Sequence, residues 1–289
     1  MISLTPIILT FNEEANIGRT LGALRWANEV IIIDSGSTDR TIEIAKAEHP
    51  NVQVVQRSFD SFAGQCNFGL SKIETEWVLS LDADYELSPQ LSAEIQALDA
   101  TDELSGFSVE FEYRIYGHAL RASVYPRRTV LYRRDCARYK EEGHAHRVVV
   151  GGLIGRLVGK IYHDDRKPLS RWIQEQDRYA KLEAKHLLRS RSSELGVRSS
   201  EDGSAYAQGY GATRPAAAGE KDRTELSVQD RLRLKIFFAA PAMFFYLLFG
   251  RGLILDGWPG WFYVAQRTIA ELLLSMRLLI ESKKLEARS

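Results

Sequence analysis

The sequence predicts an α/β protein, a mainly parallel sheet flanked by helices, with a helical, membrane-associated C-terminal region. Three observations support this prediction. Over residues 1–100, a short apolar run, a polar turn and an amphipathic stretch follow one another repeatedly, which is typical of parallel sheets. The apolar run at 77–81 then ends in two carboxylates, Asp82 and Asp84. Finally, an apolar and aromatic stretch begins near residue 236.

Taken in order, the apolar runs predict strands at 6–10, 30–33, 52–55 and 77–81. Amphipathic stretches between them predict helices, the first with Ile17, Leu21 and Leu24 on its apolar face, the second through Ile42, Ile44 and Ala45, and the third over 62–73. Ligands of open parallel sheets bind beyond the carboxyl ends of the strands. The polar residues expected at those ends are Thr10, Asn12, Glu14, Asp34, Asp82 and Asp84.

Asp82 and Asp84 stand one residue apart and would repel each other without a cation or hydrogen-bond donors between them. Carboxylate oxygens suit Mg²⁺ or Mn²⁺, and such cations suit a diphosphate. The alternative is a pair of acids that caps a helix at a surface turn. Asp34 could accept hydrogen bonds from a ribose or a base, whereas capping by Ser37 or Thr38 explains the following turn but leaves Asp34 unexplained.

Residues 10–14, 33–39 and 81–84 resemble, in order and spacing, three signature blocks of family 2 glycosyltransferases, which have the GT-A fold. The blocks at 163–167 and 256–258 and the aromatic tail make the chain similar to the subgroup that adds sugars to lipopolysaccharide core and other bacterial envelope glycans. The resemblance covers about residues 1–175 well and the tail loosely. It is specific for the family and weak for the substrate.

The resemblance implies a nucleotide-sugar donor, expected to be a UDP-sugar, and a Mg²⁺ or Mn²⁺ cofactor. It implies that Asp82 faces the sugar and takes part in catalysis, and that Asp84 and His163 hold the cation. The alternative for His163 is a structural histidine at a strand end beside Asp164 and Asp165. Residues implied to bind the donor nucleotide are Thr10, Asn12, Glu14, Asp34, Ser35, Asn67 and Asp82.

Two positions depart from the family pattern. Residues 65–67 read Gln-Cys-Asn where many members have a basic residue before the Asn, and Arg147 stands where relatives commonly have an acid. An inverting transfer needs a base within reach of the acceptor hydroxyl. Glu142, then Glu141, is the predicted base, with His144 or His146 as proton carrier; the alternative is an ordinary charged turn, and both interpretations predict a loop.

Alternation at 109–116 predicts a strand with one wet face, and arginines bracket the apolar run 129–132. Arg127 and Arg128 are candidates for binding the donor diphosphate or a phosphorylated lipid acceptor, since guanidinium groups bind phosphate in a bidentate manner. The alternative is that the arginines pair with Glu110 and Glu112 on a solvated face.

Composition limits the classes of partner and compartment. The 289 residues carry a formal net charge of zero, so no electrostatic argument favours a nucleic-acid partner. The two cysteines, Cys66 and Cys136, suggest a reducing compartment, and no leader-like segment opens the sequence, so export is not expected.

The predicted organisation has four parts. Residues 1–168 form the catalytic domain, with a nucleotide-binding half (1–100) and an acceptor half (101–168). A connecting helix over 169–188 precedes a flexible insertion over 189–225, which is rich in Ser, Gly, Ala and charge. Residues 226–289 form an amphipathic, membrane-associated helical tail.

The tail predicts contact with a membrane surface. Its apolar run over 236–249 is about 14 residues long, short of the roughly 20 that span a bilayer, and basic residues lie on both sides. We therefore expect a peripheral or re-entrant segment at the cytoplasmic face of the inner (plasma) membrane, with a buried hairpin or dimer contact as the alternative.

The leading hypothesis is a metal-dependent, inverting glycosyltransferase that moves a sugar from a nucleotide donor to a lipid-linked or core saccharide. A nucleotidyltransferase would normally begin with a Gly-rich, basic phosphate loop, which residues 10–14 lack. Arg147 and Cys66 suggest a catalytically silent scaffold, but the retained acids argue against one, because unused paired acids would be costly to keep. Dinucleotide oxidoreduction is weaker still, since no Gly-x-Gly-x-x-Gly follows the first strand.

Overall fold

The structure is a computed structural model that describes residues 2–99, 103–142, 145–194, 232–235 and 238–286. The chain divides into two compact units. The first comprises Met1–Trp172 and Phe245–Ala265 and contains the sheet; the second comprises Ile173–Phe244 and Gln266–Ser289.

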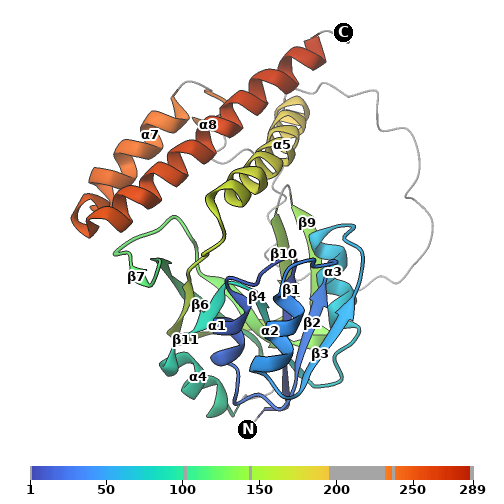
Figure 1. Cartoon of the computed structure of the whole chain (residues 1–289). Helices are drawn as coiled ribbons and strands as arrows, with labels where there is room; N and C mark the ends of the chain where they lie inside the picture. The colour runs from blue at the N-terminus through green and yellow to red at the C-terminus, as the bar shows by residue number, and fades with distance from the viewer. Residues whose placement is uncertain (1, 100–102, 143–144, 195–231, 236–237, 287–289) are drawn as a thin grey trace, which may run out of the picture. The chain divides into compact units, whose positions relative to one another are not determined.

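The predicted parallel half of the sheet is confirmed (Figure 1). Its strands are β1 (Leu4–Thr10), β2 (Val30–Asp34), β3 (Val52–Gln56) and β4 (Trp77–Asp82), in the order β3-β2-β1-β4 and all parallel. The connecting helices are α1 (Ile17–Gly22), α2 (Thr41–Glu48) and α3 (Phe62–Leu70). The register sets Thr10 beside Asp34 and Leu9 beside Asp82, so the polar strand ends meet at one edge as predicted.

Alternate residues of these strands enter two apolar cores, one on each face of the sheet. Ile8 and Ile32 pack with Ile17 and Leu21 of α1, and this core also receives Leu91 of α4 (Pro89–Gln96). On the opposite face, Ile7, Ile31 and Ile33 pack with Ala63, Cys66 and Leu70 of α3. Burial on both faces explains why the strands read as continuous β-branched runs.

The rest of the sheet is mixed. Strand β8 (Arg128–Arg133) runs antiparallel to β4 and β6 (Leu104–Ile115), and β11 (Leu153–His163) runs parallel to β6. The short strands β5 (Tyr85–Leu87) and β7 (His118–Ala119) pair with β11 and β6. The sheet is therefore mixed and flanked by helices, as expected from the sequence (Figure 1).

The expectation of a loop at Glu141 and Glu142 was wrong. After a 3₁₀ turn (Arg134–Cys136), β9 (Ala137–Glu142) and β10 (Ala145–Val150) form an antiparallel pair, with Glu142 opposite Ala145 and Glu141 opposite His146. The charged residues 140–142 are tolerated in a strand because backbone pairing across the hairpin satisfies their amides and carbonyls. Residues 143–144 lie outside the described residues.

The C-terminal part is helical. Helix α5 (Leu169–Glu194) extends six residues beyond the predicted end at 188, and most of the predicted insertion lies outside the described residues. Next come α7 (Ala239–Phe245), a π turn (Tyr246–Gly250), a 3₁₀ turn (Leu253–Asp256) and α8 (Trp258–Glu286). Among the described helices, none combines the length and apolar character needed to cross a membrane.

The second unit holds itself together by apolar and ionic contacts. Ala180, Ala184 and Leu187 of α5 pack against Leu274 and Leu278 of α8. Arg277 pairs with Asp177, and Arg233 pairs with Glu271 and Glu183. These contacts give the charged residues of both helices a structural role within this unit.

Candidate functional site

The ends of β1 and β2 are joined through Asp34, whose side chain is fully buried. Its Oδ1 accepts hydrogen bonds from the hydroxyls of Thr10 (3.1 Å) and Ser37 (2.5 Å), and its Oδ2 accepts from the amides of Gly36 (3.0 Å) and Ser37 (2.9 Å). The backbone at Gly36 has φ +91°, a conformation that favours glycine, which turns these amides toward the carboxylate. Asp34 thus organises the loop, and its predicted contact with a nucleotide stays a prediction.

Residues 12–14 are fastened to the loop that follows β2. Asn12 adopts a positive φ of 55°. Its side-chain Oδ1 accepts a hydrogen bond from the backbone amide of Thr38 at 2.7 Å, and its backbone amide donates to Ser37 Oγ at 2.8 Å. Glu14 donates its amide to Asp39 and accepts from the amide of Arg40. Hydrogen bonds therefore join the two predicted nucleotide loops to each other.

Arg171, near the start of α5, binds the first of these two loops. Its guanidinium donates to the backbone carbonyls of Phe11 and Asn12 and lies over the Phe11 ring, 5.5 Å from its centroid. The Phe11 side chain is 48% exposed, so it presents an aromatic face beside the loop.

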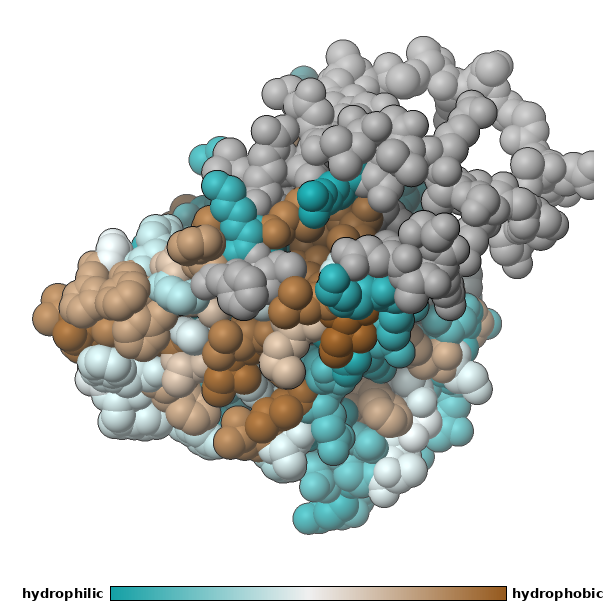
Figure 2. Space-filling view, turned by 90° about the horizontal axis from the view of Figure 1, so that it is seen from above, coloured by the Kyte–Doolittle hydropathy of each residue, from teal (hydrophilic) through white to brown (hydrophobic). Residues whose placement is uncertain are grey.

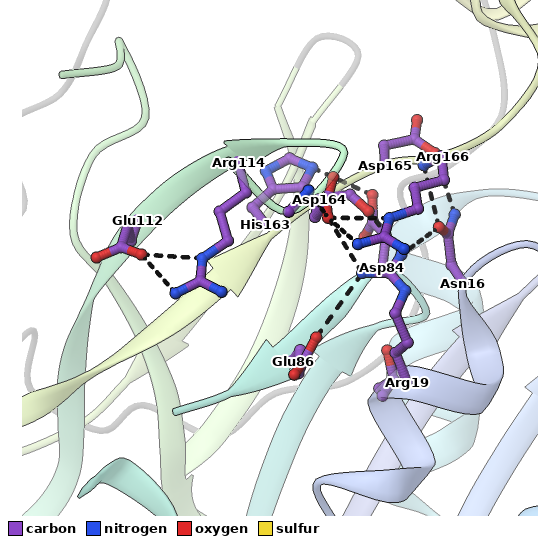
Figure 3. Close-up of polar contacts among 12 residues, drawn as sticks. Asn16, Arg19, Asp84, Glu86, Glu112, Arg114, His163, Asp164, Asp165 and Arg166 are labelled. Carbon is purple, nitrogen blue, oxygen red and sulfur yellow. Dashed lines mark hydrogen bonds and ion pairs between the residues drawn. The ribbon is translucent and has the colours of Figure 1, made fainter. Parts of the chain in front are cut away.

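The structure brings together the two predicted metal ligands, Asp84 and His163, which are 79 residues apart (Figure 3). His163 Nε2 lies 3.1 Å from Asp84 Oδ2, and each side chain is 12% exposed. Burial alone would raise the pKa of Asp84, but His163 and then Lys167 hold that pKa well below its usual range. Asp84 is therefore ionised throughout the physiological pH range.

Aromatic rings surround the imidazole. The centroids of Tyr113, Tyr125 and Tyr85 lie 4.6, 4.9 and 5.2 Å from that of His163. The hydroxyls of Tyr85 and Tyr125 are 2.5 Å apart. Nδ1 of His163 is buried and has no hydrogen-bond partner among the described residues. We call Tyr85, Tyr113 and Tyr125 the tyrosine cage.

A second polar cluster beside Asp84 was missed by the sequence analysis. Lys167 Nζ lies 2.8 Å from Glu13 Oε1 and 3.7 Å from Asp165, and Asn16 donates to both Glu13 (2.9 Å) and Asp165 (3.0 Å). Burial raises the pKa of Glu13 to about 7, with Asp84 acting in the same direction and Lys167 opposing it. Burial, and then Asp84, also raises the pKa of Asp165. The signal available was the Asp164–Lys167 block, whose partners Glu13 and Asn16, just before α1, the sequence does not reveal.

Asp164 anchors the same block to the sheet and to α1 (Figure 3). It is buried, and its Oδ2 accepts from the amide of Gly117 at 2.8 Å and from Arg166 at 2.7 Å. Arg19 reaches the backbone carbonyl of Asp164 (2.8 Å), Asn16 (2.7 Å) and Glu86 (3.7 Å). The end of β11 is thereby fixed beside the first helix, which places His163 next to Asp84.

The two arginine candidates have different partners. The guanidinium of Arg128 lies over the ring of Tyr125 at 4.6 Å, and Arg128 interacts electrostatically with Asp82 at the end of β4. Arg127 instead pairs with Glu110 at 2.8 Å and donates to the carbonyl of Ser108, which is the alternative that the sequence left open.

Asn67 is turned toward β9. Its side-chain amide donates to the carbonyl of Tyr139 at 3.0 Å and accepts from the amide of Tyr139 at 2.9 Å. Gln65 donates to the backbone carbonyls of Arg57 and Ser58 and to Ser35 Oγ. The side chains of Glu141, Glu142, His146 and Arg147, and all of His144, lie outside the described residues.

The donors at Asp84 and His163 fit a cation that is shared with a substrate. Among the described residues, no group of three or more His, Cys, Asp or Glu side chains is placed to hold a metal ion. One carboxylate and one imidazole nevertheless suit Mn²⁺, and Mg²⁺ commonly takes one or two protein ligands and completes its shell with waters and substrate phosphates. The pair does not fit a cation held by protein alone.

Comparison with known proteins supplies the family. The family model described as "Glycosyl transferase family 2" matches residues 5–156, just over half of the 289 residues. The chain belongs to glycosyl transferase family 2. It is an enzyme of the glycosyltransferase class, as predicted.

Curated relatives agree with this assignment. The lipopolysaccharide core biosynthesis glycosyltransferase LpsC of Rhizobium meliloti (strain 1021) is 28% identical over 192 residues, 63% of this glycosyltransferase and 71% of the relative. The uncharacterized glycosyltransferase RT0209 of Rickettsia typhi is 37% identical over 102 residues, 35% of this chain and about a third of the relative (34%).

Among solved structures, S. aureus TarS 1–349 in complex with UDP-GlcNAc is 18% identical, with a TM-score of 0.45, over 65% of this chain and 67% of that one. Glucosyl-3-phosphoglycerate synthase from Mycobacterium tuberculosis in complex with Mg²⁺ and UDP is 17% identical, with a TM-score of 0.44, over 69% and 81%.

Proposed function

We propose that this glycosyltransferase moves a sugar from a UDP-sugar to a lipid-linked or lipopolysaccharide-core saccharide, with inversion, and that it uses Mg²⁺ or Mn²⁺. The observation that supports this proposal most directly is the 3.1 Å contact between Asp84 and His163. It unites the second acid of the Asp-x-Asp block with the histidine of the distant block at the carboxyl edge of the parallel strands.

Asp84 and His163 would hold the cation, which when bound stabilises the charge that develops on the leaving diphosphate. The joined loops at 10–14 and 34–39 supply a rigid floor for the nucleoside, with Phe11 exposed beside them. Asp82 orients the sugar, and Arg128 adds a positive charge next to it. Rigid positioning of this kind lowers the barrier because the reactants need little reorganisation.

Glu142 is the proposed base and Glu141 the second choice. An inverting transfer needs one such group on the face of the sugar opposite the leaving diphosphate. Both residues lie at the end of β9, and Asn67 fixes this strand to α3 through Tyr139. The proposed base therefore stands on a strand that is attached to the nucleotide-binding half.

Two observations support the proposed acceptor and location. The Rhizobium meliloti relative is named for lipopolysaccharide core biosynthesis. In addition, hydrophobic side chains gather at the molecular surface (Figure 2). We define the outer face of residues 245–265 as the exposed side chains Phe245, Phe249, Leu255, Trp258 and Trp261. Aromatic and aliphatic side chains of this kind suit the headgroup region, so we place the enzyme peripherally at the cytoplasmic face of the inner membrane.

Calorimetric titration with UDP, with and without Mn²⁺, tests the donor site. We expect UDP to bind at least tenfold more tightly with Mn²⁺. Asp84→Asn should abolish that gain, because a neutral amide replaces the anionic carboxylate that would bind the cation. Asp135→Asn, which alters an exposed acid that pairs with the adjacent Arg134, is the control. Equal UDP affinity with and without Mn²⁺ in the unmodified protein would contradict metal dependence, and no UDP binding at all would favour the silent scaffold.

Co-flotation of the protein with anionic vesicles tests its location.

A further inference from the structure

The loop between β7 and β8, residues 120–127, has no regular secondary structure and is held by side chains from residues 245–265. Asp256 accepts hydrogen bonds from the amide of Arg121 at 3.0 Å and from its Nε at 2.6 Å. Arg251 donates to the carbonyl of Ser123 at 3.2 Å, and the hydroxyl of Tyr263 accepts from the amide of Val124 at 3.1 Å. We call this stretch the cage loop.

The residue after these anchors is Tyr125, a member of the tyrosine cage. Its ring lies 4.9 Å from that of His163, and its hydroxyl contacts that of Tyr85. The amide that Tyr263 holds belongs to the residue immediately before Tyr125, so the position of this anchor sets the position of the ring. A loop with few internal hydrogen bonds takes its conformation from such external contacts.

Tyr263 also reaches the cage by a second route. Its side chain is 1% exposed, and its ring lies 4.7 Å from that of Tyr113. Tyr113 in turn lies 4.6 Å from His163. Two members of the cage therefore depend on one buried side chain that lies about 100 residues beyond His163 in the sequence.

Residues 245–265 thus present two different faces. The inner face, formed by Arg251, Asp256 and Tyr263, contacts the cage loop through polar groups, and the buried ring of Tyr263 contacts Tyr113. The outer face is exposed and hydrophobic. A segment that only attached the enzyme to a membrane would not need the inner contacts.

We propose that Asp256 and Tyr263 are positioning residues for the catalytic site: through the cage loop and Tyr113 they fix the imidazole of His163 against Asp84. This inference rests on the proposed function, because it assigns the Asp84–His163 pair a role in binding the donor and its cation. It links the part of the chain proposed to meet the membrane to the donor site, so contact with lipid on the outer face and donor binding share one element.

Calorimetric titration of the full chain with UDP and Mn²⁺ tests the inference with Tyr263→Phe and Asp256→Asn. Tyr263→Phe removes the acceptor for the Val124 amide. Asp256→Asn weakens the contact with Arg121 but keeps the size and shape of the side chain at position 256. We expect each change to weaken Mn²⁺-dependent UDP binding about five- to tenfold and to leave Mn²⁺-independent binding unchanged. Asp135→Asn makes the same chemical change as Asp256→Asn on an exposed acid of the 3₁₀ turn before β9 and should have no effect.

The ¹⁵N imidazole signals of His163 give a readout that does not depend on the donor, and His163→Asn identifies them. In metal-free protein we expect these signals to shift in Tyr263→Phe and Asp256→Asn but not in Asp135→Asn. If the unmodified protein shows Mn²⁺-dependent UDP binding and both variants match it in affinity and signals, the inference is overturned. If neither the unmodified protein nor any variant binds UDP but the signals still shift, the proposed function fails while the positioning role stands. Asp256→Asn decides the result if Tyr263→Phe does not fold.

Discussion

The two sides of the site are built from different interactions. At the nucleotide edge, the loops after β1 and β2 are joined by short hydrogen bonds, and Asp34 alone accepts four. Around His163, the neighbours are mainly aromatic rings at centroid distances of 4.6 to 5.2 Å. The first side depends on direction and charge, and the second depends on packing.

This difference predicts different responses to change. A buried hydrogen-bond donor that loses its acceptor costs its full desolvation free energy, whereas aromatic pairs contribute smaller, less directional increments. The nucleotide edge should therefore fail abruptly when one acceptor is removed. The tyrosine cage should respond gradually, with changes in affinity rather than loss of fold.

The largest expected effect is from Asp34→Ala. The substitution leaves the buried hydroxyl of Thr10 and the part-buried amides of Gly36 and Ser37 without their acceptor. We expect the free energy of unfolding to fall by roughly 3–5 kcal/mol, from several buried and part-buried groups that lose their partner. Urea unfolding measures it. Glu43→Gln, at an exposed acid of α2 that pairs with Arg40, should leave the midpoint unchanged. A drop under 1 kcal/mol for Asp34→Ala would mean that water reaches this edge of the sheet and replaces the carboxylate as the acceptor.

The next effect concerns pH. Glu13 has a pKa of about 7 in the folded protein against 4.5 in the unfolded chain, so between these values the folded state binds more protons. Its contribution to stability is therefore complete below pH 4.5 and is lost as the pH rises through 7. We expect the difference in unfolding free energy between the unmodified protein and Glu13→Gln to change by roughly 2–3 kcal/mol across that window.

Urea unfolding at half-unit intervals from pH 4.5 to 8 measures that difference. The Gln side chain keeps the hydrogen bond from Asn16 but has no proton to lose, so subtraction removes the titration of the other groups. Asp39→Asn is the control. Hydrogen bonds from Thr41 and Glu14 lower the pKa of Asp39 despite burial, so the contribution of Asp39 to stability changes only below pH 4.5 and is constant across the measured range. A constant difference for Glu13→Gln would show that Lys167 keeps Glu13 ionised throughout.

Much of the nucleotide edge could be predicted from the sequence because its causes are local. Strand length, hydrophobic period and turn residues set the ends of β1, β2 and β4, and parallel pairing then brings Thr10, Asp34 and Asp82 to one edge. The pairing of Asp84 with His163 could be predicted only through the family resemblance. Spacing alone carries no information on contacts across 79 residues.

The remaining parts depend on tertiary packing. Glu13 reads as one of two adjacent acids, and only the fold decides that Glu13 turns inward to Lys167 while Glu14 stays exposed. Tyr263 belongs to the aromatic tail that the sequence predicts at a membrane surface, and nothing in the sequence places Tyr125 beside His163 or Tyr263 beside Tyr113. Residues 140–142 read as a charged turn, since the pairing of β9 with β10 is not visible in their composition.

The smallest expected effect tests the connection between the two sides. Asn67 lies on α3 in the nucleotide-binding half, and both ends of its amide are bonded to the backbone of Tyr139 in β9. Asn67→Ala removes two hydrogen bonds and should lower the free energy of unfolding by about 1–2 kcal/mol. Because the amide is already occupied by β9, we expect the affinity for UDP to be unchanged while turnover falls, since β9 carries the proposed base at Glu142. Asn51→Ala, which removes one hydrogen bond at an exposed turn, is the control for stability. A large loss of UDP affinity in Asn67→Ala would instead support the direct contact with the nucleotide that the family resemblance implies.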